Sequence, residues 1–169
     1  MAKFVKPKFD QLLAAYSTEP SSVHACNLLD PTKPGINTCA ARMSEALLIA
    51  NTIVKTRQDI ATLGNGKGSG RSFLLGRYAY PTDARLCPHG IGRGARDMAD
   101  FLRHHWGRPS QTFQRITEAP AELSTHTGVV AFIKVPGFSG QGHIDLWNQS
   151  AMVGHGYWDA DQVWFFQLT

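Results

Sequence analysis

The 169-residue sequence lacks the features that mark membrane-spanning, exported and zinc-binding proteins. No apolar run approaches the roughly 18 residues that a membrane span requires. The N-terminal Met-Ala-Lys-Phe-Val-Lys-Pro-Lys contains no apolar core of a secretory signal, so we expect no export through the general secretory route. The three cysteines include no Cys-x-x-Cys pair, so we expect no zinc site and no other cofactor.

The sequence also has no large excess of charge of either sign. Charged residues make up 18% of the chain and hydrophobic residues 43%, a composition typical of a folded globular protein. The net charge is +4, and its densest cluster, Lys3, Lys6 and Lys8, is better explained as a solvated tail than as a site for an anionic polymer. Basic and aromatic residues are not interleaved, so we expect no nucleic-acid partner. The length predicts one domain over residues 1–169.

Two segments have the period of amphipathic helices. Residues 37–51 open with Asn37 and Thr38, either of which can cap the first turn. The buried stripe of this helix is predicted to be Ala40, Met43, Ala46, Leu47 and Ala50. Residues 95–106 form the second helix, with an inner face of Met98, Phe101, Leu102 and His105.

Towards the C-terminus the period changes to that of strands. Residues 128–135 are a short apolar run rich in β-branched residues, which predicts a buried strand. We also predict strands over residues 73–80, 143–148, 151–158 and 162–168, a short helix over 8–16, and loops over 17–36 and 63–72. The glycine-rich second loop lacks the Gly-Lys-[Ser/Thr] ending of a phosphate loop with its four-residue lead-in. Helices first and an antiparallel sheet second predict an α+β fold.

Cys39 lies in the first turn of its predicted helix, where unpaired N–H groups and the positive end of the dipole favour an anion. Such a position favours a nucleophilic thiolate, although most free cysteines are simply small buried hydrophobes. Cys26 and Cys87 could form a disulfide in an oxidising compartment, and Cys39 would then be the one cysteine outside that disulfide. Spacing alone does not decide whether they pair.

His143 is the best-placed base among the seven histidines. It begins a predicted strand after a glycine-rich turn, which allows close approach of a substrate. A cysteine on a helix followed by a histidine on a strand is the order of papain-like hydrolases, and an imidazole suits proton transfer at neutral pH. The alternative is a polar residue on an edge strand with no catalytic role.

Two blocks of sequence give this pattern a family resemblance. Residues 37–44, Asn-x-Cys-Ala-x-Arg-Met-Ser, and residues 142–148, Gly-His-Ile-Asp-Leu-Trp-Asn, resemble signature blocks of the type VI secretion amidase effectors, above all of the fourth family. Residues 98–109 and the terminal Val-Trp-Phe-Phe-Gln-Leu resemble the middle helix and last strand of that family. The blocks span most of residues 37–169, whereas residues 1–36 and the glycine-rich loop match less clearly.

The resemblance implies a papain-like fold of the NlpC/P60 type, in which a nucleophile helix packs on an antiparallel sheet. Members of the family are cysteine peptidases that cut peptidoglycan stem peptides between D-glutamate and meso-diaminopimelate. The resemblance further implies a cognate immunity protein. It also implies synthesis in the cytoplasm without a signal peptide and delivery by the type VI apparatus to the periplasm of a target cell.

The residue that orients His143 is left open by the sequence, because the family's Trp-Asn-Gly followed by an aspartate on the next strand is absent. Here Trp147 is followed by Asn-Gln-Ser. A three-residue loop would pair Trp147 with Ala151 and place His155 opposite His143, within reach of its side chain. NlpC/P60 enzymes often use a histidine as the orienting residue, so His155 is the first choice.

Asp145 is the second choice, because it lies two residues after His143 on the same strand face. A two-residue loop would put Gly154 opposite His143 and favour Asp145, and Asp159 is a third candidate. Arg42 lies one turn from Cys39 and could bind a substrate carboxylate, although a structural ion pair explains it equally well.

Two other functions fit the same residues. A papain-like protein deamidase or transglutaminase would use the same cysteine and histidine, so only substrate tests separate it from a peptidoglycan amidase. A basic, non-enzymatic binding module would tolerate loss of Cys39. Peptidoglycan, an immunity protein and the type VI apparatus are the partners that the resemblance implies.

Overall fold

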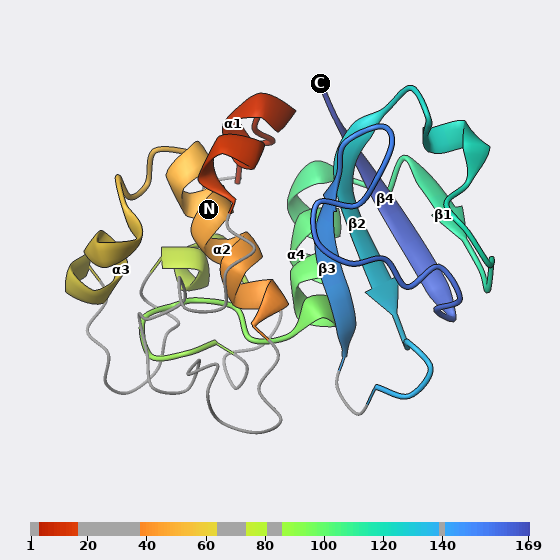
Figure 1. Cartoon of the computed structure of the whole chain (residues 1–169). Coiled ribbons are helices and arrows are strands. Elements are labelled where there is room, and N and C mark those ends of the chain that lie inside the picture. Colours follow the sequence, from red (N-terminus) through yellow and green to blue (C-terminus); the bar gives the residue numbers. More distant parts are fainter. Residues whose placement is uncertain (1–3, 17–37, 64–73, 81–85, 139–140) are drawn as a thin grey trace.

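The computed structural model describes residues 4–16, 38–63, 74–80, 86–138 and 141–169. Four α-helices and two 3₁₀ helices accompany four strands in these ranges (Figure 1). The helices are α1 (Phe9–Ala15), α2 (Cys39–Ala50), α3 (Arg57–Leu63), η4 (Leu74–Tyr78), α4 (Ala95–Trp106) and η6 (Ala121–Leu123). The strands are β1 (Gln111–Phe113), β2 (Thr127–Ile133), β3 (Gly142–Trp147) and β4 (Gln162–Leu168).

The strands form one antiparallel sheet in the order β1-β4-β2-β3. Helices α1, α2 and α4 lie on one side of this sheet, and α4 is placed between α2 and the strands in the view of Figure 1. Strand β3 is the edge strand nearest to α2, and β1 is the opposite edge. The α+β prediction is therefore confirmed, with the predicted helix half followed by the predicted antiparallel sheet.

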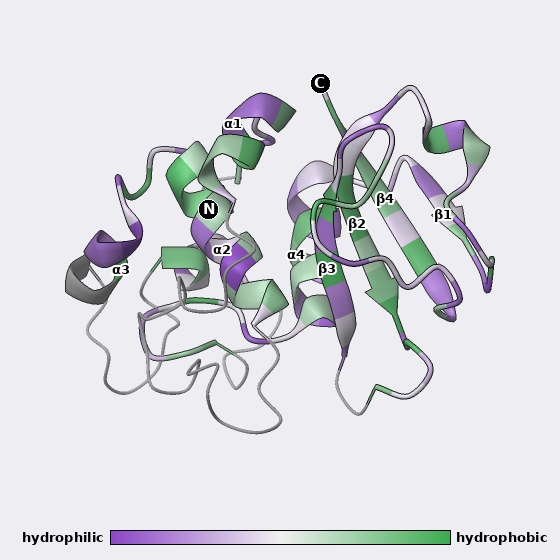
Figure 2. Cartoon of the chain, in the orientation of Figure 1, coloured by the Kyte–Doolittle hydropathy of each residue, from purple (hydrophilic) through white to green (hydrophobic). Residues whose placement is uncertain are grey.

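Both faces of the sheet are covered, since consecutive apolar residues in the middle of β2 and β4 are buried (Figure 2). On β2, Val129, Ala131 and Ile133 enter the core shared with the helices. The alternate residues Val130 and Phe132 enter a second core on the other face. Strand β3 follows the same alternation, and Ile144 and Leu146 face the helices.

The two predicted principal helices form where the hydrophobic period places them. The predicted α2 stripe is fully buried except at Ala50, which is half-buried. On α4, the predicted inner face is buried, including His105. The His105 Nδ1 accepts a hydrogen bond from the Phe4 N–H at 3.1 Å, and its Nε2 donates to the Tyr78 carbonyl. This buried imidazole therefore ties the start of the chain and η4 to α4.

Several sequence predictions are wrong or lie outside the described ranges. The strand predicted over residues 73–80 does not form in its described part, since Leu74–Tyr78 is a 3₁₀ helix and Leu74 and Ala79 have positive φ. The predicted strand over 151–158 is reduced to one bridge between Trp147 and Met152. Helix α3 and strand β1 were not predicted. Asn37, Cys26 and the predicted loop at 17–36 lie outside the described residues, as does the predicted loop at 63–72 except for Leu63, which ends α3.

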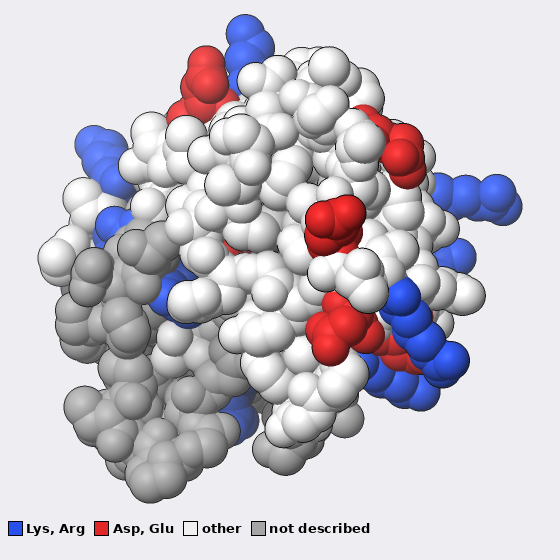
Figure 3. All heavy atoms as spheres, turned by 45° about the vertical axis from the view of Figure 1, so that its right-hand side comes forward, with Lys and Arg blue, Asp and Glu red and all other residues white. Residues whose placement is uncertain are grey.

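Basic and acidic side chains are interspersed on the face shown in Figure 3, with uncharged surface between them. This agrees with the scattered charge of the sequence. Helices in the described ranges are all too short or too polar to cross a lipid bilayer.

Gly128 is a packing constraint on the sheet. A Cβ at this position would lie 2.1 Å from the backbone oxygen of Phe166 on the neighbouring strand. We expect Gly128→Ala to lower the free energy of unfolding by about 1–3 kcal/mol, because the backbone of β4 has to move. Urea unfolding measures the change. Thr112→Ala, at an exposed position of β1, is the control and should change stability by less than about 0.5 kcal/mol. Equal effects of the two substitutions would contradict this account.

Candidate active site

Cys39 is the first residue of α2 and its side chain is buried. Thr38 occupies the cap position, as predicted for one of the two candidates, but its side chain makes no capping hydrogen bond. The first turn of α2 contains no acidic residue. The positive end of the helix dipole is therefore not offset by a carboxylate of this turn.

His143 joins the helix to the sheet. Its Nε2 lies 2.8 Å from Oδ2 of Asp145, and the ring also hydrogen-bonds to Cys39. Burial by itself lowers the pKa of His143. The hydrogen bonds to Asp145 and Cys39, with the negative charges of both groups, raise the pKa to about 9. At neutral pH the ring is therefore protonated and can donate a proton.

Asp145 is a buried carboxylate with several donors around it. Its Oδ2 accepts from the His143 Nε2 at 2.8 Å and from the backbone N–H of His155 at 3.0 Å. Its Oδ1 accepts from the Leu146 N–H at 2.8 Å. Burial alone raises the pKa of Asp145, but these hydrogen bonds and the neighbouring imidazolium lower it below its ordinary value. Asp145 therefore stays ionised and holds the His143 ring in place.

The observed register explains why His155 does not occupy this position. Trp147 bridges to Met152 and not to Ala151, so the predicted pairing is wrong by one residue. The Asn148 side chain accepts hydrogen bonds from the Ser150 and Ala151 N–H groups, and this local turn lengthens the loop. The His155 ring is exposed and its centroid lies 6.4 Å from that of His143. The geometry favours Asp145 over His155 as the orienting residue.

Two glycines make room for this arrangement. Gly142 has φ of +121°, and a Cβ there would lie 2.0 Å from the Phe132 carbonyl oxygen. Glycine is therefore required immediately before His143. A Cβ at Gly154 would lie 2.1 Å from Oδ2 of Asp145. Gly154, in the segment beside β3, therefore has no side chain at the point where the Asp145 carboxylate lies.

Tyr16 is a site residue that the sequence reasoning missed. It follows α1, is half-buried, and its hydroxyl interacts with the Asp145 carboxylate. Burial, together with the nearby charges of Asp145 and Cys39, raises the pKa of Tyr16 well above its ordinary value. The sequence assigned Tyr16 to the buried face of the first helix. Its position 23 residues before Cys39 gave no signal that it would lie beside Asp145.

Arg42 lies on α2 close to both the site and a buried acid. Its positive charge acts on Tyr16 and on Glu45, which is buried on the same helix. Burial raises the pKa of Glu45 to about 8, although Arg57 and Arg42 act in the opposite direction. The Arg57 Nε is 3.6 Å from the Glu45 carboxylate. Arg42 is thus placed for either of its predicted uses, a substrate carboxylate or a structural charge pair.

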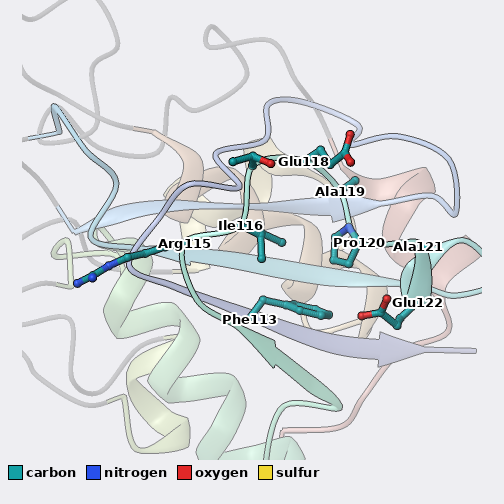
Figure 4. Close-up of a pocket in the computed structure, with 9 residues that line it drawn as sticks. Phe113, Arg115, Ile116, Glu118, Ala119, Pro120, Ala121 and Glu122 are labelled. Atoms are coloured by element: carbon teal, nitrogen blue, oxygen red, sulfur yellow. The ribbon is translucent and has the colours of Figure 1, made fainter.

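The remaining candidate regions do not adjoin this cluster. Asp159 is exposed and lines a surface hollow with Arg115 and Lys134. A second hollow of about 420 Å³ lies between β1 and the segment leading into η6, with Phe113 and Ile116 in its lining (Figure 4). It borders the opposite edge of the sheet from β3. Within the described ranges, no group of three or more His, Cys, Asp or Glu side chains is arranged to hold a metal ion.

A family model described as "Type VI secretion system (T6SS), amidase effector protein 4" matches residues 36–166. The matched range contains Cys39, His143, Asp145 and His155. A comparison with curated proteins gives no significant match.

Solved structures of the same effector type share the fold. The type VI effector Tae4 from Enterobacter cloacae is 15% identical, with a TM-score of 0.62 over 99% of this chain and 100% of that chain. The effector–immunity system Tae4/Tai4 from Salmonella typhimurium, as a selenomethionine variant, is 19% identical, with a TM-score of 0.60 over 98% of this chain and 100% of that chain. The Tae4–Tai4 effector–immunity complex from E. cloacae is 16% identical, with a TM-score of 0.58 over 98% of this chain and 100% of that chain. The predicted papain-like fold of the NlpC/P60 type is thereby confirmed.

The link between Asp145 and His143 predicts a change in titration. Asp145→Asn removes the negative charge and should lower the pKa of His143 from about 9 towards its ordinary 6.5. The measurement is an NMR titration of ring-labelled histidine. In His155→Ala the backbone N–H that contacts Asp145 remains, so the His143 titration should stay close to that of the wild type. The reverse pattern would assign the orienting role to His155.

Proposed function

This chain belongs to the family of type VI secretion system amidase effector protein 4, and we propose that it is an antibacterial cysteine amidase that hydrolyses peptidoglycan stem peptides. The observation that best supports a cysteine mechanism is the position of His143, which hydrogen-bonds on one side to Cys39 and on the other to Asp145. A nucleophile, a base and an orienting group in contact are the elements of covalent amide hydrolysis.

Cys39 is the nucleophile in this mechanism. Its thiolate attacks the amide carbonyl carbon, and the carbonyl oxygen takes up the negative charge of the tetrahedral intermediate. The Cys39 backbone N–H lies at the start of α2, where it can donate to that oxygen. Arg42, one turn along the helix, is placed to bind a substrate carboxylate on the acyl side.

His143 moves the protons. Its imidazolium protonates the amine nitrogen as the carbon–nitrogen bond breaks, which releases the amine and leaves a thioester on Cys39. The neutral ring then takes a proton from water, and the resulting hydroxide equivalent attacks the thioester. The thiolate and the imidazolium are thereby regenerated. Asp145 fixes the ring so that Nδ1 faces the sulfur throughout.

The bond that we assign is that between D-glutamate and meso-diaminopimelate. This assignment follows from the family resemblance at residues 37–44 and 142–148. In this bond the acyl donor is the γ-carboxyl of D-glutamate, which leaves a free α-carboxylate beside the scissile amide. A cationic side chain near the nucleophile suits such a substrate.

We place the activity in the periplasm of a target cell, reached from the producer's cytoplasm through the type VI apparatus. Related effectors from E. cloacae and S. typhimurium are described in complexes with the immunity protein Tai4. By analogy, this chain requires a cognate immunity protein in the cell that makes it.

Digestion of purified peptidoglycan tests the proposal. Wild-type protein should release fragments with new D-glutamate ends, detected by mass spectrometry. Cys39→Ala and His143→Ala should each lower the rate by more than about a thousandfold, because they remove parts of one covalent mechanism. His104→Ala, an exposed histidine on α4, is the matched control and should retain activity.

Two outcomes would redirect the assignment. Intact peptidoglycan together with a Cys39 thiol that reacts rapidly with iodoacetamide would favour a protein deamidase or transglutaminase. Cleavage by Cys39→Ala at the wild-type rate would remove the cysteine mechanism altogether.

A further inference from the structure

An aromatic pair lies beside the imidazole of His143 and is not used in the mechanism above. The Tyr157 ring meets the His143 ring edge to face, with centroids 5.2 Å apart. The Phe138 ring meets Tyr157 in the same manner at 4.8 Å. Phe138 lies in the loop between β2 and β3, and Tyr157 lies in the chain before β4; the two residues are called here the aromatic wall.

The aromatic wall is accessible although His143 is not. Phe138 is 38% exposed, and Tyr157 is half-buried, whereas the His143 side chain is 6% exposed. The ring of Phe132, which packs against Tyr157, is by contrast fully buried in the second core. Among the described residues, large exposed hydrophobic side chains are rare: only Val5, Leu13 and Phe138.

The chemistry of the site determines which part of a substrate reaches this wall. The carbonyl carbon bonds to the Cys39 sulfur, so the acyl part lies at the start of α2. The amine nitrogen must come within hydrogen-bond reach of His143 to receive its proton. The residue that carries this nitrogen therefore continues from His143 over the adjoining surface, which includes the aromatic wall.

We propose that Tyr157 and Phe138 bind the leaving-amine residue of the substrate, whose aliphatic side chain packs across the two rings. This assignment rests on the proposed amidase function. Packing of methylene groups on aromatic rings favours a long side chain over a methyl group, because more apolar area is removed from water. The wall thus selects the residue after the scissile bond by the length of its side chain.

The test compares two synthetic peptides that differ only after the scissile bond. One is L-alanyl-γ-D-glutamyl-meso-diaminopimelate, and the other has L-alanine in the last position. Wild type should have the higher kcat/KM for the first peptide. Phe138→Ala should reduce this preference about tenfold, mainly through KM, because a ring contact with several methylene groups is lost. Phe138→Tyr restores a ring and should restore most of the preference.

Val5→Ala is the control, since Val5 is a 66% exposed apolar residue that lies outside the aromatic wall. It should leave the preference between the two peptides as in the wild type. A Phe138→Ala protein that keeps the wild-type preference, or loses activity equally on both peptides, would overturn the proposal. Thermal unfolding of each variant checks that the fold is intact.

Binding measurements separate this proposal from the proposed function. In Cys39→Ala the substrate is not consumed, so calorimetry can compare its affinity for the two peptides with and without Phe138→Ala. If wild type cleaves neither peptide, the assigned bond is wrong. The aromatic wall is then tested by binding alone. An affinity for the diaminopimelate peptide about tenfold weaker in Cys39→Ala/Phe138→Ala than in Cys39→Ala supports the proposal, and equal affinities of the two variants for this peptide reject it.

Discussion

The hydrogen bond between His143 and Asp145 is the interaction on which the site depends. A buried carboxylate is costly unless donors surround it, and Asp145 has the His143 ring and the backbone N–H groups of Leu146 and His155. The charge that these donors keep on Asp145 in turn keeps a proton on His143. The same ring contacts Cys39, so one imidazole connects the N-terminus of α2 to the edge of the sheet.

Much of this arrangement could be predicted from the sequence, because its strongest patterns are local. The stripe that includes Met43 and Leu47 specifies the buried face of α2. The start of this helical pattern puts Cys39 in the first turn. The apolar runs of β2 and β4 specify central strands buried on both faces. Alternation along β3 puts His143 and Asp145 on one face and leaves the other to Ile144 and Leu146.

The predictions that were wrong depend on contacts that no local pattern contains. The loop after Trp147 is set by the Asn148 side chain, whose hydrogen bonds to Ser150 and Ala151 shift the register by one residue. Residues 74–80 have the composition of a strand, but they pair with no strand among the described residues, and Leu74–Tyr78 forms a 3₁₀ helix. Tyr16 reaches Asp145 only because α1 folds back against α2, which is a tertiary event.

The placement of the histidine and its carboxylate two residues apart on one strand has an evolutionary consequence. Their relative position is set by the covalent backbone of β3 and does not depend on how the following hairpin closes. From the neighbouring segment the pair needs only a bare α-carbon at Gly154 and the amide of residue 155. Exposed positions of the turn, such as Ser150 and Ala151, can therefore be substituted without loss of the His143–Asp145 contact, as long as the hydrogen bonds of Asn148 keep the register. The side chains of this turn are thus separated from the requirements of the His143–Asp145 pair, so sequence variation there comes at little cost to the geometry of the pair.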